Sequence, residues 1–277
     1  MNSSFLIAQI SDLHLKAGQR LTYGVVDTLA ALRHAVDHLN ASLPRPDIVV
    51  ISGDLVDFGR PDEYAVLAPE LARLQMPCYL VPGNHDHRKH LLAGLPEHRY
   101  LPRVTDGPLD WVVDEYPLRL IGLDSTTPGA HGGCVTDTQL EWLDEQLSLR
   151  PAVPTLLILH HPPFITGIGH MDRESFQNAP GLEAVVARHP QVERLLCGHM
   201  HRPMQRRFGG SISCVCPGTS HQIVLDLQDA APAHFNLEPA GYLLHAWHPQ
   251  HGLVTHNGVF GEYAGPYPFY DENGLID

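Results

Sequence analysis

The stretch LLCGHMHRP, residues 195–203, places a glycine and two histidines directly after a short apolar run. An apolar run of this length is typical of a buried strand. His199 and His201 are therefore predicted to lie just beyond the end of a strand. A single His-x-His pair can also arise by chance, because one short motif has a high false-positive rate. The pair gains meaning only if similar side chains follow other strands of the same sheet.

Four other apolar runs are followed by side chains of the same kind. They are Asp12 and His14 after residues 5–10, Asp54 after residues 47–52, Asn84, His85 and Asp86 after residues 78–82, and His160 and His161 at the end of residues 155–160. The carboxyl ends of parallel strands meet at one edge of a sheet, and ligands bind there. We therefore expect all of these side chains to lie close together.

Apolar runs and amphipathic segments alternate along much of the chain. The predicted strands are residues 5–10, 47–52, 78–82, 119–124, 155–160 and 193–197, and the predicted helices are residues 25–39, 61–74, 136–147 and 181–189. This alternation is typical of βαβ units, in which helices cover a mostly parallel sheet.

The pattern changes from about residue 208. Residues 211–216, 221–227 and 241–247 are predicted strands separated only by turns, which indicates an antiparallel part. The stretch FGEYAGPYPFYDENG (260–274) is rich in aromatic residues, glycine and proline. It predicts an irregular tail that packs on the body or on another subunit. We expect a core in residues 1–207, and in residues 208–277 the remaining strands of the same domain plus an extension for oligomer contacts.

Composition restricts the partners and the compartment. The formal net charge of −13 argues against long nucleic acid, which requires a basic surface. No window has the length of a membrane span, and the first residues indicate a strand rather than a signal peptide. The five cysteines form no CxxC motif. These features favour a cytoplasmic protein that does not contact membranes.

The side chains after the strands are carboxylates, imidazoles and one carboxamide, without thiolates. This donor set suits Mn²⁺, Fe²⁺, Co²⁺ or Zn²⁺. There are more donors than one ion needs, whereas two ions roughly 3.5–4 Å apart and bridged by a carboxylate would use them all. Gly53, Gly83 and Gly198 each precede a predicted ligand, and the missing Cβ allows close approach of the backbone.

Five motifs together resemble a known family. DLH (12–14), GDLVD (53–57), GNHD (83–86), HHPP (160–163) and GHMH (198–201) look like the blocks of the calcineurin-like metallophosphoesterase superfamily. PGTSHQ (217–222) and YAGPYPFYDEN (263–273) are similar to bacterial glycerophosphodiesterases in its cyclic-nucleotide and glycerophosphodiester branch. The resemblance implies an α/β (α+β) fold, namely a four-layer α/β/β/α sandwich with a small antiparallel C-terminal part.

The resemblance also implies roles for individual residues. One metal would take Asp12, His14 and His201, the other would take Asn84, His160 and His199, and Asp54 would bridge them. Substrate contacts would come from Asn84, His85, His221 and Tyr23, and His85 would protonate the leaving group. His85 could instead only orient a ligand, His221 could be an ordinary strand residue, and Tyr23 a surface tyrosine. His161 is expected to be structural or to orient a ligand, and Asp86 to orient a neighbour.

The predicted function is a binuclear phosphodiesterase that hydrolyses small phosphodiesters through a metal-activated hydroxide. Glycerophosphodiesters such as glycerophosphocholine or glycerophosphoethanolamine are favoured as substrates. A 3′,5′-cyclic nucleotide phosphodiesterase is the main alternative, and a phosphomonoesterase, a nuclease or a non-catalytic scaffold is less favoured. The resembled enzymes form dimers and larger oligomers, so a homo-oligomer is expected.

Overall fold

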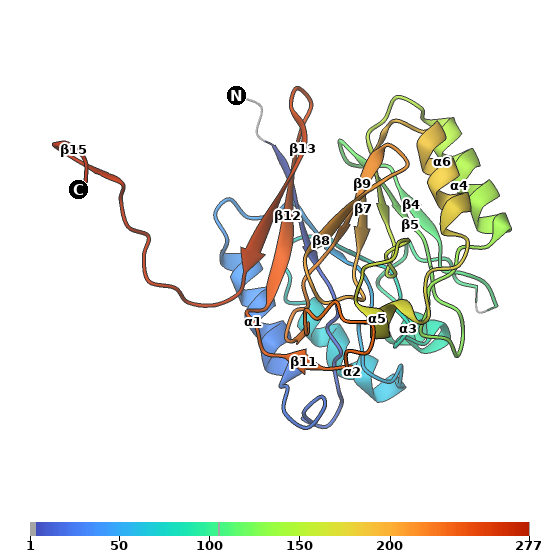
Figure 1. Cartoon of the computed structure of the whole chain (residues 1–277), viewed down its shortest axis with the longest axis horizontal. Helices are drawn as coiled ribbons and strands as arrows, with labels where there is room; N and C mark the ends of the chain where they lie inside the picture. The colour runs from blue at the N-terminus through green and yellow to red at the C-terminus, as the bar shows by residue number, and fades with distance from the viewer. Residues whose placement is uncertain (1–3, 105, 277) are drawn as a thin grey trace.

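The computed structural model describes residues 4–104 and 106–276. Two β-sheets pack face to face, and helices cover the outer face of each sheet (Figure 1). This is the predicted four-layer sandwich. The first strand, from Phe5, lies in one sheet, and the C-terminal segment extends away from the body.

The first sheet combines the start of the chain with its end. Its strands, in spatial order, are β13 (Gly252–Val259), β12 (Gly241–His248), β1 (Phe5–Ile10), β2 (Ile48–Ile51) and β3 (Cys78–Leu80). Strands β1, β2 and β3 are parallel, whereas β12 is antiparallel to both β1 and β13. The parallel strands β1 to β3 therefore send their carboxyl ends, and the loops that follow, to one edge.

The second sheet is also mostly parallel. Its strands, in spatial order, are β4 (Trp111–Val113), β5 (Arg119–Gly122), β6 (Thr155–Ile158), β7 (Val192–Cys197), β9 (Ser211–Val215) and β8 (Met204–Phe208). Strands β5, β6, β7 and β9 are parallel, and the two edge strands are antiparallel to their neighbours.

The helices and two small hairpins complete the structure. The helices are α1 (Thr28–Ala41), α2 (Pro61–Leu71), α3 (Arg88–Gly94), α4 (Asp137–Leu149), α5 (Gly169–Asp172) and α6 (Ala179–Arg188). The hairpins pair β10 (Gln222–Ile223) with β11 (Phe235–Asn236) and β14 (Tyr270–Asp271) with β15 (Gly274–Leu275). At the start of α4, Thr136 and Gln139 form the expected reciprocal capping box.

Alternating side chains bind the layers together. On β6, Leu156 and Ile158 pack in the apolar cluster between the two sheets, while Leu157 packs in the cluster beneath α4 and α6. Successive residues of a strand point to opposite faces, so a strand buried on both faces must be apolar throughout. This explains why the buried parallel strands are continuous apolar runs in the sequence.

The antiparallel part predicted after residue 208 is present, since β8 pairs antiparallel with β9 and β12 pairs antiparallel with β13, but details of that region differ from the prediction. Strand β9 is parallel to β7, because the chain reverses direction once before strand β8 and once after it. The predicted strand at residues 221–227 shrinks to β10, and Leu225 beyond it is 61% exposed. The tail does not fold back on the body but projects as an arm, with Tyr267 76% exposed (Figure 1). Strands β9, β12 and β13 belong to the two main sheets.

Candidate metal centre

The seven expected ligands converge at one edge of the two sheets. Asp12, His14 and Asp54 offer ligand atoms within 4.8 Å of one another, and so do His160, His161 and His199. His201 Nε2 lies 3.1 Å from His14 Nε2, and Asn84 Oδ1 lies 3.2 Å from His160 Nε2. The loops after β1, β2 and β3 face those after β6 and β7 across the sandwich.

Most of these residues have an unusual backbone. Left-handed φ angles occur at Asp12 (57°), His14 (45°), Asp54 (50°), His199 (69°) and His201 (47°). Such angles are uncommon outside glycine and cost about 1–3 kcal/mol each. Hydrogen bonds between loops hold them, since Asp12 N donates to Gly53 O (3.1 Å) and His14 N donates to Asp54 O (3.0 Å). The sharp turns direct the side chains back over the strand ends.

Two glycines allow the loops to approach this closely. A Cβ atom on Gly83 would lie 2.2 Å from Asp54 Oδ1, and one on Gly198 would lie 2.0 Å from Ser11 Oγ. Any side chain at either position would therefore displace backbone or a buried carboxylate. This confirms that both glycines are required for close packing around Asp54 and Asp12.

Three imidazoles are fixed through Nδ1. The bonds are His14 Nδ1 to Asp57 Oδ1 (3.3 Å), His160 Nδ1 to Ser52 O (2.8 Å) and His201 Nδ1 to His221 O (3.0 Å). Because these partners are acceptors, each Nδ1 carries the hydrogen and donates it. In the neutral ring, Nε2 is then left with a free lone pair. This tautomer is the one that metal-binding histidines adopt when a second group orients them.

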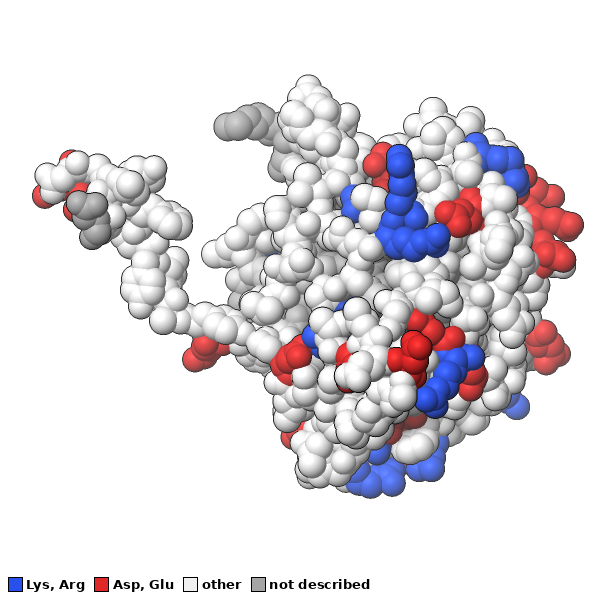
Figure 2. Space-filling view, viewed as in Figure 1, with Lys and Arg blue, Asp and Glu red and all other residues white. Residues whose placement is uncertain are grey.

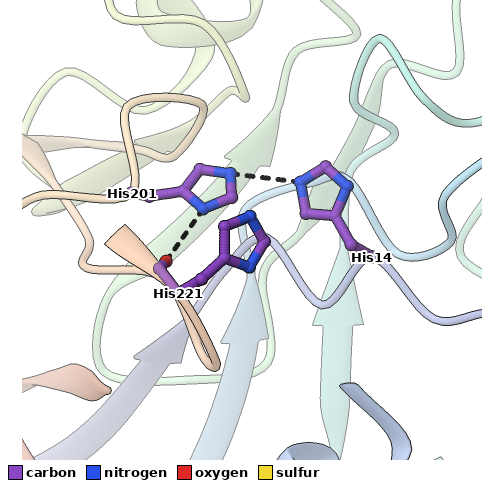
Figure 3. A group of neighbouring side chains, drawn as sticks. All are labelled: His14, His201 and His221. Carbon is purple, nitrogen blue, oxygen red and sulfur yellow. Dashed lines mark hydrogen bonds between the residues drawn. The ribbon is translucent and has the colours of Figure 1, made fainter. Parts of the chain in front are cut away.

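Two features of the site indicate that it binds a cation. The lone pairs on Nε2 of His14 and of His201 face each other at 3.1 Å, and neither neutral ring has a second hydrogen to share (Figure 3). Asp12 Oδ2 is buried and has no hydrogen-bond partner among the described residues. A divalent ion would satisfy these atoms, and carboxylate, imidazole and carboxamide donors suit such an ion. The residues present therefore fit a metal.

Burial and mutual charge shift the pKa values at the site. Burial raises the pKa of Asp12 to about 6, with His160 opposing that effect. Burial would also raise the pKa of Asp54, but His160 and His85 hold it well below its usual value. Burial would lower the pKa of His160, yet the negative charge of Asp54 raises it to about 9. Asp54 is thus the carboxylate most strongly kept ionised.

Sequence reasoning missed Asp57, the last residue of the GDLVD motif. Its carboxylate binds His14 Nδ1 and Lys16 Nζ (3.1 Å), and its carbonyl oxygen accepts a hydrogen bond from His85 Nδ1 (2.8 Å). Asp57 therefore orients two histidines from opposite sides. Its place within the motif, three residues after Asp54, was the available signal.

Asp86 has the orienting position that was expected. Its carboxylate accepts hydrogen bonds from Leu55 N (3.0 Å), Gly83 N (2.9 Å) and the Tyr64 hydroxyl (2.8 Å). Burial, followed by the charge of Asp54, raises its pKa to about 7. These contacts tie the loop after β3 to the loop after β2, and so fix where Asn84 and His85 stand.

A main pocket of 590 Å³ opens over the candidate ligands. Tyr23, His85 and His221 line it, as expected for residues that face a substrate. The ring of His221 packs 4.5 Å from that of His201 and 5.4 Å from that of Tyr23. Sequence reasoning did not find the other lining residues, which come from segments without a recognisable motif and include His131, His170, Arg173, Glu174, His234 and Phe235.

The family model for calcineurin-like phosphoesterases matches residues 5–203, which include all five motif blocks and the parallel strands of both sheets except β9. The chain belongs to the calcineurin-like phosphoesterase family. Members of this family depend on divalent metals, which agrees with the donor set described above.

Full-length relatives of this phosphoesterase are phosphodiesterases by name. A probable glycerophosphodiester phosphodiesterase of Arcobacter nitrofigilis is 37% identical, covering 98% of this chain and 100% of that protein. A glycerophosphodiester phosphodiesterase of Enterobacter lignolyticus is 34% identical, covering 97% and 95%. The 3′,5′-cyclic adenosine monophosphate phosphodiesterase of Escherichia coli is 32% identical, covering 78% and 76%.

Solved structures support the fold of this phosphoesterase. A dimetal phosphatase from Danio rerio superposes with a TM-score of 0.67 at 16% identity, covering 94% of this chain and 100% of that one. Within residues 4–104 and 106–276, no helix combines the length and apolar character needed to cross a membrane.

Proposed function

We propose that this protein is a metal-dependent phosphodiesterase that hydrolyses small phosphodiesters, with glycerophosphodiesters as the favoured class. One observation carries the proposal, namely the facing Nε2 atoms of His14 and His201 beside the unpartnered oxygen of Asp12 at the base of the main pocket. The full-length similarity to glycerophosphodiester phosphodiesterases supports the choice of substrate.

Each of two divalent ions would have its own ligands. Asp12, His14 and His201 would hold one ion, Asn84, His160 and His199 would hold the other, and Asp54 would contact both. The ions could be Mn²⁺, Fe²⁺, Co²⁺ or Zn²⁺. When bound, they supply Lewis acidity, which makes water a nucleophile near neutral pH and neutralises the phosphoryl charge.

His85 would act on the leaving alcohol. Its Nδ1 hydrogen is engaged by Asp57 O, and its backbone N donates to Asp54 Oδ1 (2.9 Å), so the ring is fixed at the wall of the main pocket. A proton held at the other ring nitrogen, Nε2, can pass to the departing alkoxide. An imidazole suits this role because one ring nitrogen can hold a proton while the other is fixed by a hydrogen bond. His221 and Tyr23 would contact the same alcohol.

A 3′,5′-cyclic nucleotide phosphodiesterase is the second candidate. The similarity to the Escherichia coli enzyme for cyclic adenosine monophosphate favours it. The same ligands would serve both reactions, so the walls of the main pocket decide between them. Tyr23 and Phe235, whose ring centroids are 5.0 Å apart, offer aromatic surface to either kind of alcohol.

The test is a rate comparison on protein stripped with a chelator and reloaded with Mn²⁺ or Co²⁺. Glycerophosphoethanolamine and 3′,5′-cyclic AMP are assayed side by side. We expect metal-dependent hydrolysis with a clear preference for the first. A preference for cyclic AMP would move the protein to the second candidate. Inactivity on both with metals bound would overturn the proposed function.

We propose in addition a cytoplasmic homo-oligomer formed by one domain and its C-terminal extension. All five cysteines are free, which suits a reducing compartment. Residues 208–260 would complete the core, and the arm beyond them would bind a second copy. Figure 2 shows that this arm carries few charged atoms, all of them acidic. Its exposed aromatic side chains need a partner surface. Light scattering of the full chain and of a chain ending at residue 260 would test whether the arm forms the oligomer.

A further inference from the structure

A second cavity lies beside the candidate metal centre. It has a volume of 470 Å³, and we call it the side cavity; residues that line it include Asn84, Arg88, Lys89, Asp106, Thr126 and Thr127. Asn84 also lines the main pocket, whereas His85 lines only the main pocket. Asn84, a candidate metal ligand beside which a phosphoryl group would be held, therefore forms part of the wall of both cavities.

The wall of the side cavity is rigidly built. Arg88 Nε donates to Asp124 Oδ2 (2.6 Å), and the Asp124 side chain is fully buried. Arg88 Nη2 donates to Thr126 O (2.9 Å) and to Thr126 Oγ1 (3.0 Å). Asp124 in turn accepts hydrogen bonds from Thr126 N and from Leu109 N. A buried carboxylate thus fixes the guanidinium at this wall.

Two cationic side chains in the side cavity have donor capacity left over among the described residues. Arg88 Nη1 has no hydrogen bond to any residue that the structure describes, and Lys89 forms no ion pair within the described chain. The acidic side chains of Asp86 and Asp106 are also present, so the lining is polar and of mixed charge. Such a lining suits a hydroxylated group and disfavours an acyl or aromatic one.

We propose that the side cavity binds the alcohol that stays on phosphorus when the diester is cleaved, and that it selects a hydroxylated alcohol such as glyceryl. This rests on the proposed function. A phosphodiester has two alcohol substituents, and the two cavities that meet at Asn84 provide one place for each. The leaving alcohol belongs in the main pocket, because His85 faces that pocket.

The atoms balance for this orientation. The oxygen of water forms a bond to phosphorus, and the bond from phosphorus to the alcohol in the main pocket breaks. The departing alkoxide takes one proton and leaves as an alcohol. The alcohol in the side cavity remains esterified, so the second product is its phosphomonoester, with Arg88 and Lys89 beside it.

The experiment uses two diesters with the same leaving group. Manganese-loaded full-length protein hydrolyses glyceryl p-nitrophenyl phosphate and methyl p-nitrophenyl phosphate, and the ratio of their kcat/KM values is measured. Thr127→Trp fills the side cavity and Lys89→Gln removes a charged donor. Thr138→Trp, on the exposed surface of α4, is the matched control. Inhibition by glycerol phosphate and by methyl phosphate reports binding without turnover.

We expect Lys89→Gln to lower the glyceryl-to-methyl ratio by about tenfold, the loss of one hydrogen bond to a charged group. Thr127→Trp should lower it at least as much, because it occupies the space that the glyceryl group would fill. Inhibition by glycerol phosphate should weaken by a similar factor, and Thr138→Trp should leave the ratio unchanged. An unchanged ratio in both variants, or an equal loss on both diesters, overturns the inference. If Thr127→Trp does not fold, Lys89→Gln decides alone. Wild-type protein inactive on both diesters would instead overturn the proposed function.

Discussion

Each half of the candidate metal centre contains three neighbouring histidines, and the two triplets differ in their third member. His14, His201 and His221 form one triplet, and His160, His199 and His161 form the other. The ring of His161 is bonded at both nitrogens, to Ser125 Oγ (2.9 Å) and to His131 O (3.0 Å). The only bond recorded for the ring of His221 within the described chain is from Nδ1 to Ser220 Oγ (3.0 Å).

This difference shows that proximity alone does not make a histidine a ligand. His161 donates from Nε2 to a carbonyl and accepts at Nδ1, so it has no lone pair left for a metal. It packs 4.7 Å from the ring of His199, and burial followed by the charge of His160 holds its pKa well below the usual value. His161 is therefore placed to position His199, whereas His221 faces the main pocket.

The largest expected effect comes from the carboxylate that both triplets share. Asp54→Ala removes the charge next to His14 and His160, at 3.5 Å and 3.3 Å. We expect loss of both metals and a fall in kcat/KM of roughly a thousandfold, equivalent to about 4 kcal/mol of transition-state stabilisation. Elemental analysis and steady-state kinetics measure this. Retention of both metals would show that Asp54 does not join the two halves.

His85 belongs to neither triplet. Replacing it therefore tests proton transfer to the leaving group separately from metal binding. His85→Ala should lower kcat about a hundredfold, the lower range for loss of a general acid, while metal content stays at the wild-type level. The loss should shrink with a p-nitrophenyl diester, because that leaving group needs little protonation. An equal loss on good and poor leaving groups would indicate that His85 only orients its neighbours.

Replacing His161 and replacing His221 should have different effects on metal binding and on KM. His161→Phe keeps an aromatic ring but removes both hydrogen bonds, and should weaken one metal site by about 10–100-fold, with activity recovered at high metal concentration. His221→Phe should retain both metals and raise KM about tenfold. Calorimetric titration of apo-protein, together with KM, gives both results. Loss of an ion from His221→Phe would make His221 a ligand.

His245 is a control for burial without a nearby metal. Its ring is bonded to Thr255 Oγ1 and Gln9 Oε1, and burial followed by the charge of Arg194 lowers its pKa from 6.5 to about 3. Between these values the unfolded state binds more protons, so the free energy of unfolding should fall as pH drops below 6.5. The slope should reach about 1.36 kcal/mol per pH unit.

Denaturant melts at several pH values measure this slope. His245→Gln should flatten the pH dependence while kcat and metal content stay unchanged. If the slope persists in the variant, other groups account for the acid sensitivity. If activity falls with it, the inner face of the sandwich influences the metal centre more than the described contacts indicate.

The sequence predicted the parallel strands and the candidate ligands well, because both leave local signals. Buried strands such as β2 must be apolar on both faces, and a metal ligand must follow directly where such a strand ends. The four predicted helices also formed, with ends shifted by a few residues. The resemblance to a known family supplied the layer order, which no local pattern contains.

The strands and pocket residues that the sequence did not predict lack these local signals. Strand β8 carries Arg206 and Arg207 on an exposed edge, so it has no apolar run. Strand β13 is another edge, with polar residues on both faces. The pocket walls at Arg173 and Phe235 come from loops whose positions depend on tertiary packing. The predicted antiparallel part is present in β12 and β13, but β9 also pairs in parallel with β7, because strand direction depends on pairing partners that no local pattern identifies.

The candidate ligands come from both sheets, and this has a mechanical consequence. Asp12 and Asp54 follow strands of one sheet, while His160 and His201 follow strands of the other. Two ions held by these ligands would cross-link the sandwich at one edge, and the ion bound by Asp12 and His201 would close a loop of almost 190 residues. Such a link adds to stability by mass action, so resistance to heat would rise with free metal concentration.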